Sequence, residues 1–238
     1  MRFIIPMAGM SRRFRDAGYA APKYLIEAKG QTLLERSLRS LPLELADLVI
    51  FIVLQEHLDG FDAADRIERI MGERPYRIVA LPKATRGQAE TVLAAADWID
   101  PDRDLVIFNI DTTFLSERLR TALLDPAAKC DGILGSFQAS GPNWSYARLD
   151  ADGYVAETAE KVEISHHALT GLYHFTRGDD FVRVARKAVQ QDQRSGGEFY
   201  VAPLYNDLIA EGRKFVLDPA QSFLPLGTPE ELEAFLRA

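Results

Sequence analysis

The chain has 238 residues, of which 47% are hydrophobic and 26% charged, a composition typical of a soluble globular protein rather than a disordered one. Its formal net charge of −7 argues against nucleic acid or an anionic membrane as the main partner, because binding to either needs a basic face. A small anionic substrate stays compatible with this charge, since a local cluster of cations can oppose the global sign.

Cysteine content and hydropathy indicate the compartment. Cys130 is the single cysteine, so the chain can form neither an intrachain disulfide nor a zinc site built on thiolates. The sequence runs from Met1 straight into a strand-like segment, without the pattern of a signal peptide. Since no apolar run approaches the roughly 18 residues of a membrane span, we expect a cytoplasmic protein without a membrane partner.

The first apolar run, Phe3–Ile5, has the length of a buried strand and leads into small residues. A basic cluster then follows in this otherwise acidic protein: Arg12, Arg13, Arg15 and Lys23. A loop here would present backbone N–H groups together with cations, an arrangement that binds triphosphates. The alternative is a surface turn with solvated arginines.

Strands and helices then alternate. Continuous apolar runs indicate strands covered on both faces, and apolar residues at helical spacing indicate amphipathic helices. The predicted strands are Leu48–Leu54, Tyr76–Leu81, Leu105–Ile110 and Gly132–Gln138, and the predicted helices are Gln31–Leu41, Asp62–Met71 and Gln88–Trp98. This alternation predicts an α/β fold with a mainly parallel central sheet.

The pattern changes in the second half of the chain. Short strands joined by turns indicate an antiparallel meander, and helical spacing then returns. The predicted strands are Trp144–Leu149, Tyr154–Glu157 and Ala168–Phe175, and the predicted helices are Asp179–Gln191, Ala202–Glu211 and Pro229–Arg237. Because no linker, repeat or low-complexity tract interrupts the sequence, we expect a single domain over residues 1–238.

The strand predicted at Leu105–Ile110 ends directly in Asp111. Ligands of open α/β sheets bind beyond the carboxyl ends of the strands, so a carboxylate at this position faces the binding site. Asp111 is therefore the best candidate for a metal ligand. The alternative is an N-cap for a helix that starts near Leu115, a role that Thr113 or Ser116 can also fill.

Several motifs follow one another in a specific order. They are the loop within Ile5–Phe14, Pro22-Lys23 with Gly30 downstream, Gly87–Thr91, Asp111, Ala159-Glu160-Lys161, Leu169–Tyr173 and the late turn Leu226–Pro229. Together they resemble the sugar-phosphate nucleotidyltransferases, also called nucleotide-sugar pyrophosphorylases, over most of the chain. The resemblance implies a Rossmann-like three-layer sandwich with a small antiparallel meander near the sugar pocket.

The resemblance also implies roles for individual residues. Arg13 would contact the outer phosphates of a nucleoside triphosphate, Lys23 the α-phosphate, and Asp111 a Mg²⁺ ion. The expected nucleotide-binding residues are Ala8, Gly9, Met10, Ser11, Gly87 and Gln88. The expected residues for the sugar 1-phosphate, or another small phosphate, are Tyr146, Glu160, Lys161, Gly171 and Glu198.

Some of these residues have alternative roles. Lys161 lies in a charged run and can be an ordinary surface lysine. Core packing is an alternative for Tyr146, as for its aromatic neighbour Trp144. Glu198 can satisfy backbone donors at a helix start instead of binding sugar hydroxyls.

Two positions depart from the family's pattern. Ser11 stands where the signature loop usually has glycine, so we expect the phosphate cradle to differ there. Pro225 and Leu226 stand where many members carry an aspartate that completes the metal site. Asp111 with phosphates and water remains compatible with Mg²⁺, which often takes only one or two protein carboxylates.

The expected chemistry is attack of an ionised acceptor phosphate on the α-phosphorus of the triphosphate, with release of pyrophosphate. No general base is required, since the second pKa of a phosphate is about 6. A metal-dependent glycosyltransferase is the alternative, although that class typically uses Asp-x-Asp. A catalytically silent nucleotide-binding module is another. The nucleobase, the acceptor and the oligomeric state are not predicted.

Overall fold

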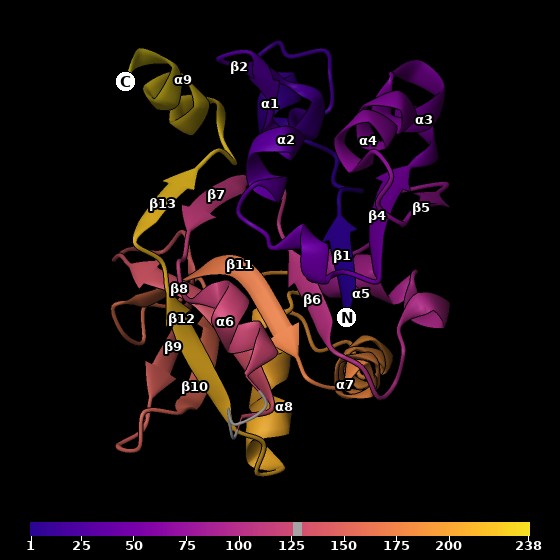
Figure 1. The fold of residues 1–238 in the computed structure, drawn as a ribbon. Helices are drawn as coiled ribbons and strands as arrows, with labels where there is room; N and C mark the ends of the chain where they lie inside the picture. Colours follow the sequence, from indigo (N-terminus) through magenta and orange to yellow (C-terminus); the bar gives the residue numbers. More distant parts are fainter. Residues whose placement is uncertain (126–129) are drawn as a thin grey trace.

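The computed structural model describes residues 1–125 and 130–238. Nine strands of these residues form the main sheet: β1 (Arg2–Pro6), β4 (Leu48–Leu54), β5 (Tyr76–Leu81), β6 (Leu105–Phe108), β8 (Gly132–Gln138), β9 (Ser145–Leu149), β10 (Val155–Glu160), β11 (His167–Phe175) and β12 (Phe215–Pro219). The main path runs β10-β9-β11-β6-β1-β4-β5, while β8 pairs with β11 and with β12 (Figure 1).

The centre of the sheet is parallel. Strand β1 pairs in parallel with β4 and β6, so that Ile4 lies between Ile50 and Ile107. All three side chains are fully buried, as expected for strands covered on both faces. Strand β11 is antiparallel to β6, and β9 and β10 continue as the antiparallel meander. The predicted α/β fold with a mainly parallel sheet is thus confirmed.

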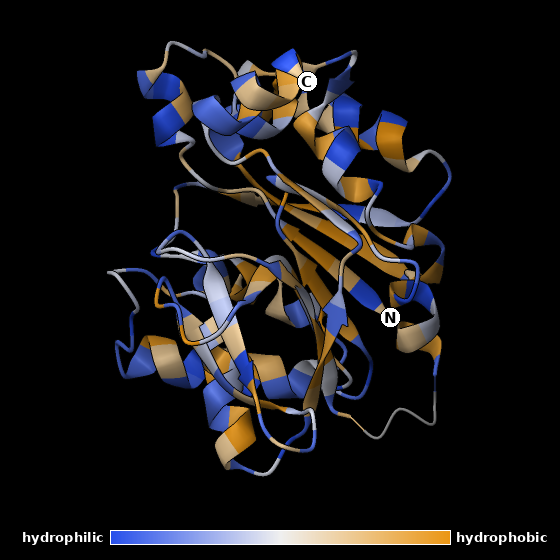
Figure 2. Ribbon diagram, turned by 90° about the vertical axis from the view of Figure 1, so that its left-hand side faces the viewer, coloured by the Kyte–Doolittle hydropathy of each residue, from blue (hydrophilic) through white to orange (hydrophobic). Residues whose placement is uncertain are grey.

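Helices cover both faces of this sheet, in three layers. One face packs against α2 (Leu33–Leu38), α4 (Ala63–Met71) and α6 (Leu119–Leu124), and the other against α5 (Gln88–Leu93), α7 (Gly178–Gln190) and α8 (Tyr205–Ala210). A hydrophobic core lies on each face of the sheet, and successive side chains of β1 point into the two cores alternately: Phe3 packs on the first face and Ile4 on the second. Figure 2 shows the hydrophobic strands between helices of mixed hydropathy.

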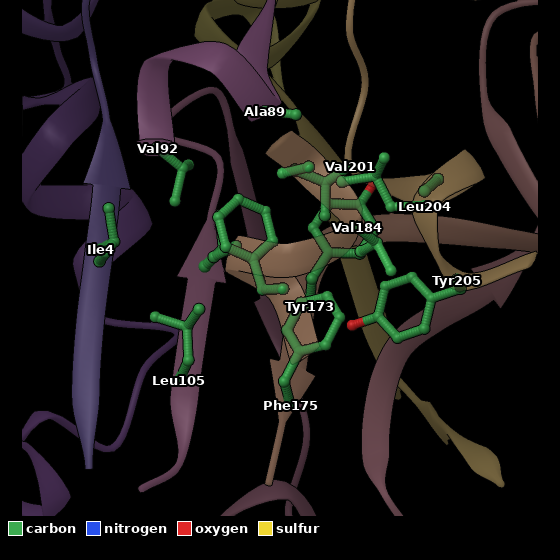
Figure 3. Close-up of a cluster of buried hydrophobic side chains, with 14 of the residues drawn as sticks. Ile4, Ala89, Val92, Leu105, Tyr173, Phe175, Val184, Val201, Leu204 and Tyr205 are labelled. Carbon is green, nitrogen blue, oxygen red and sulfur yellow. The ribbon is translucent and has the colours of Figure 1, made fainter. Parts of the chain in front are cut away.

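The second core draws on residues from both halves of the chain. Ile4 and Leu105 from the parallel strands share it with Tyr173 of β11, Val184 of α7 and Tyr205 of α8 (Figure 3). The hydroxyl of Tyr205 is satisfied within this core, because it donates to the carbonyl oxygen of His174 at 3.2 Å. The two halves of the chain are therefore joined by packing as well as by strand pairing.

The expected helix near Leu115 is wrong. Thr112–Leu115 form strand β7, which pairs with β13 (Ser222–Pro225) in a separate antiparallel sheet. Helix α6 begins only at Leu119, whose backbone N–H donates to Ser116 Oγ at 3.0 Å. The threonines and the phenylalanine within Thr112–Leu115 have a high β-propensity, and they form a strand because β13, which lies far along the chain, pairs with them.

Local details also differ near the N-terminus. Residues Gln31–Thr32 form strand β3, paired with β2 (Glu27–Ala28), so helix α2 begins at Leu33 rather than Gln31. Thr32 starts this helix with a capping box, in which its Oγ1 accepts from Glu35 N–H and its own N–H donates to Glu35 Oε2 at 2.6 Å. Two further helices are α1 (Arg12–Asp16) and α3 (Gln55–Gly60).

The last helix, α9 (Pro229–Arg237), brings the C-terminal end of the chain close to α1 and β2 (Figure 1). Its buried Leu232 packs in a third hydrophobic cluster with Phe14 of α1, Ile26 and Leu226. The C-terminal helix therefore packs against helix α1, which follows the loop after β1. Within residues 1–125 and 130–238, no helix is long and apolar enough to cross a membrane.

Candidate active site

The loop after β1 lies beside the carboxyl end of β6, its parallel neighbour. Ser11 in this loop has φ 50° and ψ 34°, a left-handed conformation that glycine adopts freely and that costs other residues about 1 kcal/mol. Its hydroxyl accepts a hydrogen bond from the backbone N–H of Lys23 at 3.1 Å. Gly9 is exposed, and a Cβ there would meet no atom within 4 Å, so the space above the loop is open.

Lys23 and Asp111 meet at this edge of the sheet. Lys23 Nζ donates to Asp111 Oδ2 at 2.7 Å, with 24% and 25% of the two side chains exposed. Lys23 comes from a short 3₁₀ turn, Lys23–Leu25, and Asp111 follows β6. The residues that the sequence predicts as catalytic lysine and as metal ligand are thus direct neighbours, although 88 residues separate them.

Asn109 connects two other predicted residues, Gln88 and Gly171, by hydrogen bonds, and the sequence reasoning missed this residue. Gln88 Nε2 donates to Asn109 Oδ1, and Asn109 N–H donates to the carbonyl oxygen of Gly171 at 3.2 Å. Gly171 has φ +88°, and a Cβ there would lie 2.6 Å from Asn109 Nδ2. Gly87 is equally constrained, because its Cβ would lie 2.3 Å from Phe199 N. Only glycine fits these two positions.

A third group lies at the meander. Lys161 Nζ donates to the Tyr200 hydroxyl at 2.9 Å, which raises the pKa of Lys161. Ser145 Oγ donates to Glu160 Oε2. Burial raises the pKa of Glu160, and the charge of Glu198 adds to this, while Ser145 and Lys161 oppose it. The structure therefore brings together the predicted residues Glu160, Lys161 and Glu198, with Ser145 and Tyr200 as additional partners.

The structure does not support a sugar contact for Tyr146. This side chain is fully buried, and its hydroxyl donates to the carbonyl oxygen of Gly141 at 2.6 Å. Its role is packing, which was the alternative. Glu198 does not stand at a helix start, which was its alternative role. Its backbone forms an isolated antiparallel β-bridge with Ser195, and the next helical turn begins only at Ala202.

Tyr173 connects the meander group with Asp111. It lies on β11 and is buried, which raises its pKa, and the nearby charges of Glu160 and Asp111 raise the pKa further. A hydrogen bond with Ser145 acts in the opposite direction. Because the charges of Glu160 and Asp111 both raise the pKa of Tyr173, the Lys23–Asp111 pair and the group of Glu160 and Lys161 lie in one region of the molecule.

Among residues 1–125 and 130–238, no three His, Cys, Asp or Glu side chains form a group that could hold a metal ion. One more carboxylate does lie near Asp111. A Cβ on Gly227 would be 3.1 Å from Asp111 Oδ2 and 3.6 Å from Glu231 Oε2, so both carboxylates lie close to this position. Burial and the charge of Asp111 raise the pKa of Glu231, while Arg13 lowers it. Carboxylate oxygens are the donors that Mg²⁺ prefers, so this pair fits the ion.

The order of these elements along the chain agrees with a known family. A family model described as the MobA-like NTP transferase domain matches residues 3–173, which include the loop, Lys23, Asp111, Glu160 and Lys161, whereas Glu198 and Tyr200 lie beyond the match. The chain belongs to the MobA-like NTP transferase family. No curated protein matches the sequence.

Solved structures extend the likeness of this MobA-like chain beyond residue 173. A nucleoside-diphosphate-sugar pyrophosphorylase from Vibrio cholerae RC9 is 37% identical, with a TM-score of 0.84 over 99% of this chain and 100% of that one. The family and this similarity support a nucleotidyltransferase, as the sequence motifs predicted.

Two more distant structures share the fold of the MobA-like chain. The inositol-1-phosphate CTP transferase of T. maritima is 13% identical, with a TM-score of 0.76 over 98% of this chain and 93% of that one. A Bacillus anthracis structure in complex with sucrose, described as a glucose-1-phosphate thymidylyltransferase, is 15% identical, with a TM-score of 0.76 over 99% and 93%. At these identities the likeness concerns the fold.

Proposed function

We propose that this chain is a cytoplasmic, single-domain enzyme that transfers a nucleotidyl group from a nucleoside triphosphate to a sugar 1-phosphate or a similar small phosphate. The observation that carries the proposal is the Lys23–Asp111 contact of 2.7 Å beside the open loop at Gly9. A cation and a carboxylate at the carboxyl ends of parallel strands suit a phosphate with its metal ion.

In the proposed reaction an oxygen of the acceptor phosphate attacks the α-phosphorus. A new P–O bond forms, the bond from the α-phosphorus to the bridging oxygen breaks, and pyrophosphate leaves with that electron pair. The nucleophile is already ionised near neutral pH, so no side chain has to remove a proton. Catalysis then consists of bringing two polyanions together and neutralising their charge.

The proposed roles follow the three groups of the site. Arg13 binds the outer phosphates and Lys23 stabilises the charge that develops at the α-phosphate. Lys161 binds the acceptor phosphate, and Gln88 with its partner Asn109 lies on the nucleotide side. Asp111 would hold Mg²⁺, which supplies further charge neutralisation when it is bound.

The two alternatives have less support. Asp111 is followed by two threonines rather than by the second carboxylate of an Asp-x-Asp motif. A glycosyltransferase also leaves the basic loop unexplained, because a nucleotide-sugar has no triphosphate. A silent binding module gains support only if no substrate pair reacts.

A substrate panel tests the proposal. The protein is incubated with each nucleoside triphosphate, Mg²⁺, and a set of sugar 1-phosphates together with inositol 1-phosphate, and pyrophosphate release is measured. We expect release with at least one pair. Silence across the panel would favour the binding module, whereas sugar transfer from a nucleotide-sugar would favour the glycosyltransferase.

The proposed role of Lys23 is tested by Lys23→Met with the active substrate pair. We expect turnover to fall by about 10²-fold or more, because one preorganised charge contact to the developing negative charge is lost. Lys187→Met is a matched control, since Lys187 Nζ also contacts an aspartate, Asp207, at 2.9 Å on the exposed side of α7. Wild-type turnover in the Lys23 variant, with both variants folded, would exclude a catalytic role for this lysine.

A further inference from the structure

Glu231 and Asp111 both lie close to the Cβ position of Gly227, and neither the sequence motifs nor the proposed reaction assigns Glu231 a role. We infer that Glu231 is the second carboxylate of the divalent-cation site at Asp111. This inference rests on the proposed function, because it takes Asp111 as the first protein ligand. It adds a ligand from helix α9, which begins after the turn rather than on the strand before it.

The backbone around Gly227 brings the two carboxylates close to one position. Leu226 N–H donates to the carbonyl oxygen of Asp111 at 2.8 Å, which ties the turn to the end of β6. A Cβ on Gly227 would lie 3.1 Å from Asp111 Oδ2 and 3.6 Å from Glu231 Oε2. Because residue 227 is glycine, it places no side-chain atom of its own at this position near both carboxylates.

Glu231 is held rigidly in this position. Its Oε2 accepts from Gly227 N–H at 2.8 Å and from Thr228 N–H at 3.0 Å, as part of the capping box of α9. Both bonds go to Oε2, so the cap does not require Oε1. A carboxylate fixed by its own hydrogen bonds is a better ligand than a mobile one, because less side-chain freedom is lost on binding.

The turn itself offers no other carboxylate. Pro225 and Leu226 carry no side-chain oxygen, so Glu231 is the acidic side chain that the structure places beside Asp111 across this turn. Lys23 Nζ contacts the Asp111 oxygen that lies close to the Cβ position of Gly227, Oδ2. A divalent cation bound there would therefore compete with Lys23 for Asp111.

The chain contains a matched control for the capping function of Glu231. Glu35 makes the same capping box with Thr32 at the start of α2, and it too is partly buried. If Glu231 were only a cap, Glu231→Gln and Glu35→Gln would have the same effect. If it is also a ligand, only Glu231→Gln changes cation binding.

The test is a titration of the full chain, without nucleotide, with Mn²⁺ as the probe, followed by electron paramagnetic resonance of the free ion. Mn²⁺ prefers the same oxygen ligands as Mg²⁺. We expect Glu231→Gln to weaken Mn²⁺ binding by about tenfold or more, and Glu35→Gln to leave it unchanged. Gly227→Ala should also weaken binding, since its Cβ lies close to both carboxylates and its backbone does not need the left-handed conformation.

The outcomes separate this inference from the proposed function. If Asp111→Asn weakens Mn²⁺ binding and Glu231→Gln does not, Glu231 is only a cap and the inference is overturned. If neither variant changes binding, or if the wild-type chain binds no Mn²⁺ without nucleotide, Asp111 and Glu231 do not form a cation site by themselves and the inference is overturned, whereas a cation held by Asp111 together with substrate phosphates stays open to the substrate panel. Pyrophosphate release in the substrate panel remains a separate measurement of the reaction.

Discussion

Ser11 departs from the family's pattern, and its backbone adopts a left-handed conformation that glycine adopts freely. Its left-handed conformation costs a residue with a Cβ about 1 kcal/mol, and its hydroxyl accepts from Lys23 N–H at 3.1 Å. A net hydrogen bond contributes about 1 kcal/mol, so the two effects roughly cancel. The hydroxyl of Ser11 thus joins the loop after β1 to the Lys23 segment, which a glycine cannot do.

This balance predicts different results for two substitutions. Ser11→Ala keeps the strained backbone and loses the hydrogen bond, so we expect a loss of about 1 kcal/mol in the free energy of unfolding. Ser11→Gly loses the bond but relieves the strain, so we expect a stability close to wild type. Urea unfolding of the three proteins measures both. Equal destabilisation by alanine and glycine would show that the conformation carries no strain here.

The residues of the candidate site differ in how well their place in it could be predicted from the sequence. Asp111 could be predicted because it directly follows a buried strand, and Lys23 because it belongs to a basic cluster in an acidic chain. Asn109 stands at the same strand end, a signal that was available but unused. Glu231 had only a capping-box signal, Thr228 followed by a glutamate three residues later. Nothing local to Glu231 indicates that the fold brings it to Asp111.

At the scale of elements, helix α9 packs the end of the chain against helix α1, which follows the loop after β1. Leu232 is buried in the cluster that contains Phe14 of α1 and Leu226 of the late turn. We expect Leu232→Ala to lower the free energy of unfolding by about 2–5 kcal/mol, the range for a leucine removed from a packed core. Chemical denaturation measures this loss.

Leu236→Ala on the same helix is the control, because Leu236 is 45% exposed. We expect this change to stay within about 0.5 kcal/mol of wild type, as surface substitutions usually do. A small effect of Leu232→Ala, similar to that of the control, would mean that α9 is not firmly docked. The placement of Glu231 beside Asp111 would then lose its structural basis.

Elements with their own periodic pattern were predictable, whereas elements that depend on a distant partner were not. The buried strand Leu48–Leu54 was predicted with the bounds of β4, because seven consecutive apolar residues suit a strand covered on both faces. Strand β7 was mistaken for the approach to a helix, since it is short and its partner β13 lies far along the sequence. Its pairing is a tertiary interaction, which local propensity does not contain.

At the scale of the whole molecule, one sheet and one core join the two halves of the chain. Strand β11 pairs with β6 along Leu172–Phe175 and also with β8 and β9. The core on the helix α7 side includes Ile4 and Ile107 from the first half and Phe175 and Phe215 from the second. Neither half can unfold without exposing apolar surface of the other, which costs about 25 cal/mol per Å².

We therefore expect thermal unfolding to occur in a single cooperative transition, despite a length of 238 residues, at which many chains form two domains. Differential scanning calorimetry should give a van't Hoff enthalpy equal to the calorimetric one. Two resolved transitions would contradict the single domain. Phe175→Ala sharpens the test, because this buried residue lies on the strand that joins the halves. If the two halves fold as one unit, Phe175→Ala lowers the midpoint temperature of the single transition. If the halves fold independently, it lowers the midpoint of only one of two transitions.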